Sequence, residues 1–161
     1  MTKMEEVAKM AAKEAVAELR REDERKRRSR IFQNTKALME NYNRIMLSVD
    51  EGISDLKELT DDPIEGIDDE NVFVESIIKS KARSLIMLAH IDKCLELLER
   101  EEYRRNTPER YLAFKYLYID GMTHESIAEV LGCADRTSRR WITDLTRSLS
   151  VYLFGVDALR L

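Results

Sequence analysis

The chain has 161 residues, which is enough for one compact domain and an extension. Hydrophobic residues make up 43% of it and charged residues 36%, a composition typical of a soluble, helix-rich protein. No stretch approaches the roughly 20 apolar residues that a membrane span needs, and charged residues interrupt the N-terminus, so we expect neither a membrane segment nor a signal peptide. The net charge of −4 does not favour nucleic acid, but basic residues gathered on one face can still bind DNA.

Residues 1–30 are predicted to form a charged helical arm. A thin apolar stripe is followed by a dense charge run from Arg20 to Arg30. One interpretation is a basic arm lying against the DNA backbone or RNA polymerase. The other is a solvated helix held by i,i+4 ion pairs such as Glu22–Lys26 and Glu24–Arg28.

Residues 31–102 are predicted to form an antiparallel helical hairpin. Apolar residues recur at 31–59 with the four-and-three spacing of a heptad, and a break or bend is expected near Asp50 because Gly52 follows. An acidic linker with Pro63 and Gly66 covers 61–70, and a second amphipathic helix capped by Asn71 covers 71–102, with Lys81 as the one interruption of its apolar face. The two apolar faces are too wide for one another alone, so we expect a homodimer.

The linker carboxylates lack the spacing of a calcium-binding loop, and nothing there shields them from water. His90 and Cys94 form an i,i+4 pair without a third ligand nearby, and Cys94 and Cys133 fit reduced thiols in a cytoplasm. The sequence also shows no nucleophile–base pair and no glycine-rich phosphate loop. We therefore predict no metal, no cofactor and no catalytic activity.

Residues 103–161 are predicted to form a helix-turn-helix domain. Pro108 opens a lead-in helix that ends at Asp120-Gly121, and Thr123 is placed to cap the next helix. Gly132 follows that helix where a left-handed residue is favoured, and Asp135 is placed to cap the last helix. The apolar residues of the two helices share one buried side; they are Ile127, Ala128, Leu131, Trp141, Ile142, Leu145 and Leu149.

The other side of the last helix carries residue types that bind phosphates and read base edges in a major groove. These residues are Arg136, Thr137, Arg139, Arg140 and Thr143. We expect Arg139 and Arg140 to make most of the contacts within the 136–146 helix, so alanine at both should abolish DNA binding. Thr123 and His124, at the start of the preceding helix, are candidates for a phosphate contact. An Ala-xxx-Gly corner alone occurs in many helical hairpins, and the arginines are what favour DNA.

The segment YLYIDGMTHESIAEVLGCADRTSRRW resembles the C-terminal helix-turn-helix of sigma-factor region 4. It is more closely similar to phage late-gene regulators of the ArpU and RinA type, over about the last third of the chain. Ser138 departs from the pattern, which usually has valine or isoleucine there. The resemblance implies binding of promoter DNA in the cytoplasm of a bacterial host cell, and activation of late packaging and lysis genes.

The sequence thus predicts an all-α, sequence-specific DNA-binding transcriptional regulator that acts as a homodimer on double-stranded DNA. Two alternatives remain open. One is a small terminase-like subunit that recruits DNA, in which a helix-turn-helix accompanies an oligomerising hairpin. The other is a sigma-like subunit that acts only with RNA polymerase.

Overall fold

The computed structural model describes residues 2–60 and 69–159, and the side chains of residues 2–51 and 75–159. Within these ranges the protein is all-α, as predicted, and contains no strand. The helices are α1 (Lys3–Thr60), α2 (Asp69–Arg104), α3 (Pro108–Tyr118), α4 (His124–Leu131), α5 (Asp135–Phe154) and the short 3-10 helix η1 (Gly155–Ala158). The core of the predicted acidic linker, residues 61–68, lies outside the described residues.

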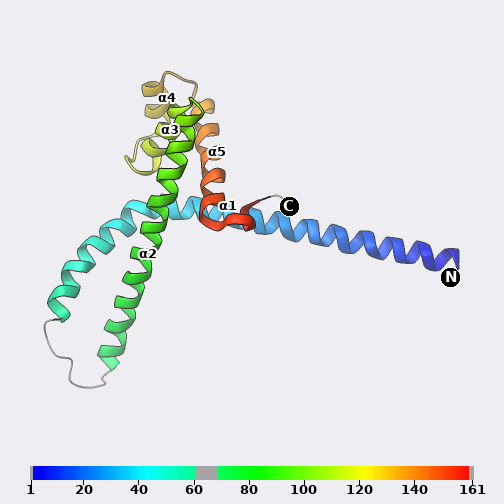
Figure 1. Cartoon of the computed structure of the whole chain (residues 1–161), viewed down its shortest axis with the longest axis horizontal. Helices are drawn as coiled ribbons and strands as arrows, with labels where there is room; N and C mark the ends of the chain where they lie inside the picture. The colour runs from blue at the N-terminus through cyan, green and yellow to red at the C-terminus, as the bar shows by residue number, and fades with distance from the viewer. Residues whose placement is uncertain (1, 61–68, 160–161) are drawn as a thin grey trace.

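Helix α1 joins the predicted arm and the first hairpin helix into one element of 58 residues. No proline or glycine occurs between Lys3 and Glu51, so nothing in the sequence separates the two segments. The helix also continues past Asp50 and Gly52 to Thr60, since one interior glycine costs only about 1 kcal/mol. At 1.5 Å per residue, α1 is roughly 87 Å long, and its N-terminal part projects away from the other helices (Figure 1).

The second half of α1 curves and lies antiparallel beside α2 (Figure 1). Near the curve, Thr35 Oγ1 donates to Ile31 O at 2.9 Å and Asn41 Nδ2 donates to Ala37 O at 2.8 Å. Side-chain bonds of this kind to the carbonyl four residues earlier tend to bend a helix.

Two polar contacts fix the register of α1 against α2. The Tyr42 hydroxyl donates to the Asp92 carboxylate, and Lys81 Nζ donates to Ser48 O at 2.7 Å. Lys81, the interruption in the apolar face of α2, therefore has a partner across the hairpin. Burial, with the hydrogen bond to Asp92 as a second cause, raises the pKa of the Tyr42 hydroxyl well above its ordinary value. The hydroxyl is therefore protonated at neutral pH and can donate to Asp92.

The core lies where the middle of α1 meets the C-terminal half of α2 and helices α3 and α5. Met39, Ile91, Leu98, Phe114 and Leu145 are fully buried there. Phe114 and Tyr118 meet edge to face, with ring centroids 4.9 Å apart. This shared core holds α4 and the start of α5 near the C-terminal end of α2 (Figure 1).

Several helix ends differ from the prediction by a few residues. Helix α2 begins at Asp69, ahead of the predicted cap Asn71, and ends at Arg104. Helix α3 ends at Tyr118, and Gly121 follows with a positive φ of 67°. The apolar run after Leu149 continues α5 as far as Phe154, with Leu149 fully buried and Phe154 exposed.

Candidate nucleic-acid interface

The corner between α4 and α5 has the local geometry that the sequence predicts. Thr123 is the N-cap of α4, and its Oγ1 accepts a hydrogen bond from Ser126 N at 3.2 Å. Gly132 is the left-handed C-cap with φ 62°, and the N–H of Cys133 donates to Ala128 O at 3.0 Å. Ile127 and Ala128 are buried against the rest of the domain. The caps at both ends of α4 are therefore confirmed.

The start of α5 differs slightly from the prediction. Ala134 is the cap residue and Asp135 is the first helical residue. The Asp135 carboxylate instead accepts from Arg139 Nε at 2.6 Å. Ser138, where the resembling family has valine or isoleucine, is fully buried, and its hydroxyl donates to Asp135 O at 3.0 Å. A backbone carbonyl thus satisfies the polar group that the core encloses.

The outward face of α5 carries a line of four polar side chains, which we call the α5 stripe. The stripe consists of Arg136, Arg140, Thr143 and Arg147, spaced four, three and four residues apart as on one face of a helix. Arg136 and Arg140 are exposed, and neither makes an ion pair within the described residues. Arg136 and Arg147 lie roughly 16 Å apart along the helix axis.

Arg147 was not among the site residues that the sequence predicts. Its spacing from Arg136, Arg140 and Thr143 was the available signal. Its side chain is 67% exposed, its guanidinium lies 5.7 Å from the centre of the Phe32 ring, and Nη1 lies 3.5 Å from Asp144 Oδ1. Arg147 therefore belongs to the stripe and also contacts α1.

Arg139 lies on the flank of α5 that faces α4, beside the stripe. Its guanidinium is paired with Asp135 at 2.6 Å and with Glu125 of α4 at 3.9 Å, and its side chain is 49% exposed. These pairs reduce its capacity to bind a phosphate or a base, since the acidic groups must first be displaced. Thr137 is half-buried on the opposite flank of the stripe.

His124 and Thr143 line one hollow of about 680 Å³ together with Arg139 and with Lys36 of α1. His124 Nδ1 is buried and has no hydrogen-bond partner among the described residues. Thr123 is exposed, but its hydroxyl donates to Ser126 Oγ at 2.9 Å in addition to capping α4. The structure thus brings His124, Arg139 and Thr143 together beside α1. Arg136 and Arg140 lie further along the stripe.

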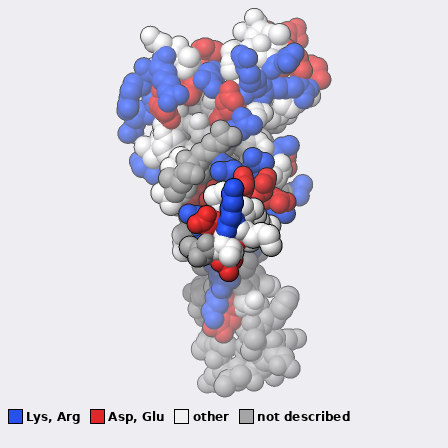
Figure 2. Space-filling view, turned by 90° about the vertical axis from the view of Figure 1, so that its right-hand side faces the viewer, with Lys and Arg blue, Asp and Glu red and all other residues white. Residues whose placement is uncertain are grey.

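The charge of the α4–α5 unit is balanced. Residues 123–147 contain four arginines and four carboxylates, so the unit has no net charge with His124 neutral. The excess of basic residues lies on α1, where residues 20–30 include seven basic and three acidic side chains. A view along the projecting arm shows Lys and Arg groups gathered on two sides of the upper part of the molecule (Figure 2).

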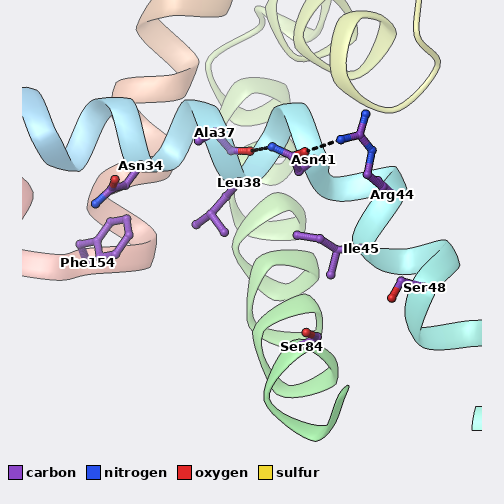
Figure 3. Close-up of a pocket in the computed structure, with 9 residues that line it drawn as sticks. All are labelled: Asn34, Ala37, Leu38, Asn41, Arg44, Ile45, Ser48, Ser84 and Phe154. Carbon is purple, nitrogen blue, oxygen red and sulfur yellow. Dashed lines mark hydrogen bonds between the residues drawn. The ribbon is translucent and has the colours of Figure 1, made fainter. Parts of the chain in front are cut away.

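A second hollow, of about 700 Å³, lies on the other flank of α1. It is lined by apolar and amide side chains from α1 and by Arg44 and Ser48, with Ser84 of α2 and Phe154 of α5 at its edges (Figure 3). Leu38 and Ile45 point into this groove, and the amide of Asn41 accepts from Arg44 Nη1 at 3.4 Å. The groove offers apolar contact area and carries no cluster of catalytic groups.

No family model, no curated protein and no solved structure matches this chain. In the part of the chain that the structure describes, no three metal-ligating side chains come together, and no helix is long and apolar enough to cross a membrane. We therefore infer the function from the geometry of the α4–α5 unit and the α5 stripe.

Proposed function

We propose that this chain is a sequence-specific DNA-binding transcriptional regulator that inserts the N-terminal half of α5 into a major groove. The α5 stripe is the observation that carries the proposal. Arginine and threonine side chains at helical spacing, exposed on a helix that a short turn joins to α4, are suited to base edges and phosphates. Within the stripe, Arg136 and Arg140 are the principal contacts, with Thr143 in support. Regulation of phage late genes follows from the resemblance and is part of the same proposal.

The test is a selection from random-sequence DNA duplexes, followed by gel-shift measurement on the enriched sequence. The wild-type chain is expected to enrich a defined motif without RNA polymerase. The double substitution Arg136→Ala/Arg140→Ala should weaken binding at least about 30-fold, because each base contact contributes roughly 1–3 kcal/mol.

A matched control removes two arginines from the hairpin. Arg83 and Arg100 are exposed on α2, and Arg83→Ala/Arg100→Ala gives the same loss of charge away from the stripe. This control should keep the enriched motif and most of the affinity. If the Arg136/Arg140 variant enriches the wild-type motif with equal affinity, the proposed use of α5 is wrong. Binding that appears only after polymerase is added would favour the sigma-like alternative.

We also propose that two chains associate through their hairpins. Large apolar side chains are exposed on the hairpin: Leu47, Ile77, Leu85, Ile86 and Met87, with Ile86 70% exposed. A two-fold dimer would present two α5 helices to half-sites one helical turn apart.

Light scattering tests the assembly. The wild type should have the mass of a dimer, and Leu85→Glu/Ile86→Glu should be monomeric with unchanged helix content. The control Lys79→Glu/Arg83→Glu changes exposed polar positions of the same helix and should remain dimeric. A ring of eight or nine chains would support the terminase-like alternative, and a wild-type monomer would contradict hairpin pairing.

A further inference from the structure

Helix α1 carries basic side chains that take no part in the proposed contact between the α5 stripe and the major groove. The α4–α5 unit has no net charge, so it adds no long-range attraction for DNA by itself. Neutralised phosphates supply essentially all of the non-specific affinity of DNA-binding proteins and a large share of the specific affinity, and they require Lys and Arg side chains. Residues 20–30 of α1 supply an excess of such side chains, and α1 lies beside the C-terminal half of α5, where Phe32 contacts Arg147.

Arginines from the two helices meet in one hollow of about 750 Å³. Arg25 and Arg28 of α1 line it with Arg147 of α5, together with the hydroxyl-bearing residues Ser148 and Ser150. No carboxylate belongs to its described lining. Arg25 and Arg28 make no ion pair within the described residues, whereas Lys26 and Arg27 are paired with Glu22 and Asp157. The positive charge and the hydrogen-bond donors of this hollow suit an anion.

The position of α1 relative to α5 is held by specific contacts. Arg27 Nη2 pairs with Asp157 Oδ1 at 2.8 Å, which ties α1 to η1 directly after α5. The Arg147 guanidinium lies over the Phe32 ring, which ties α5 back to α1. The three arginines of the hollow are therefore presented at one place, so binding an anion there requires little ordering of the chain.

The hollow lies at the far end of the α5 stripe. From Arg136 to Arg147 the stripe is roughly 16 Å long, whereas the major groove is about 12 Å wide. A helix that places Arg136 and Arg140 over the base edges therefore brings Arg147 to the phosphate backbone that borders the groove. Arg25 and Arg28 meet the same strand from α1.

We propose that the hollow formed by Arg25, Arg28 and Arg147 receives backbone phosphates of the DNA strand that borders the groove. This inference rests on the proposed function, and it gives α1 a direct role in binding DNA. The contacts are independent of base sequence, so they add affinity and fix the angle at which α5 enters the groove.

The experiment measures the salt dependence of binding to a labelled duplex of about three helical turns and mixed sequence, between about 50 and 200 mM salt. Arg25→Gln/Arg28→Gln should lower the slope of log affinity against log salt by about 1.8, which corresponds to two phosphate contacts. Glutamine is a good helix former, so the helix content measured by circular dichroism should not change.

Two further variants separate a local phosphate contact from a general effect of charge. Lys9→Gln/Lys13→Gln removes the same charge from exposed positions further along the arm and should keep the wild-type slope. Arg25→Lys/Arg28→Lys retains both charges and should also keep it. If the glutamine variant keeps the wild-type slope, or if all three variants lose it equally, the inference is wrong while the proposed function stands. A wild-type chain that does not bind the duplex at all contradicts both.

Discussion

We predict that position 132 requires glycine because of its backbone conformation and not because a side chain would clash there. Its φ is 62°, in the left-handed region, and a Cβ built at this position meets no atom within 4 Å. Gly132→Ala should therefore cost only the strain of an alanine with positive φ, about 1–2 kcal/mol, offset by about 0.4–1 kcal/mol from the less flexible unfolded chain. The net loss is of the order of 1 kcal/mol, or a melting temperature lower by about 2–4 °C.

Gly132→Asn supplies the comparison, because asparagine tolerates the left-handed region better than alanine does. Although asparagine is larger than alanine, Gly132→Asn should lower the free energy of unfolding less than Gly132→Ala, since the space around Gly132 is open. Urea denaturation of the three proteins, followed by circular dichroism, gives the two differences in free energy of unfolding. A larger loss for asparagine than for alanine would show that space limits the corner, and the conformational argument would then be wrong.

Three further predictions concern the domain that holds α5. Thr123→Ala should destabilise the protein by about 1 kcal/mol through loss of the α4 cap, whereas Thr123→Ser should retain most of the stability; equal losses in urea denaturation would contradict a capping role. Leu145→Ala should cost about 2–5 kcal/mol because this side chain is fully buried, whereas Val130→Ala, 61% exposed, should change the stability by less than about 0.5 kcal/mol in the same assay. Burial, with the Glu99 carboxylate as a second cause, raises the pKa of the Tyr111 hydroxyl from 10.0 to about 12. The unfolded chain therefore releases this proton first as the pH rises, and stability should fall by roughly 1.4 kcal/mol per pH unit between pH 10 and about 12. Tyr111→Phe should show a shallower alkaline loss, and an unchanged profile would contradict this assignment.

The order and the type of the helices could be predicted from the sequence because local rules decide them. Thr123 and Gly132 cap α4 as predicted, since capping depends on a few neighbouring residues and on one backbone angle. The four-and-three spacing likewise identified the faces on which Ile127, Leu145 and Leu149 are buried. The arm and the first hairpin helix form one continuous helix, because a change in charge pattern does not interrupt the hydrogen bonds of a helix.

The roles of individual arginines depend on the tertiary structure. In the sequence Arg139 and Arg140 look alike, but α4 brings Glu125 toward Arg139 while Arg140 stays on the open stripe. Arg147 shares the helical spacing of the stripe, and the tertiary structure adds Arg25 and Arg28 beside it because α1 passes the end of α5. The sequence by itself determined the helices, the caps of α4 and the buried faces, because these follow from interactions a few residues apart. Only the packing of α1 and α4 against α5 decided which charges from different helices come together, because those distances join segments far apart in the chain.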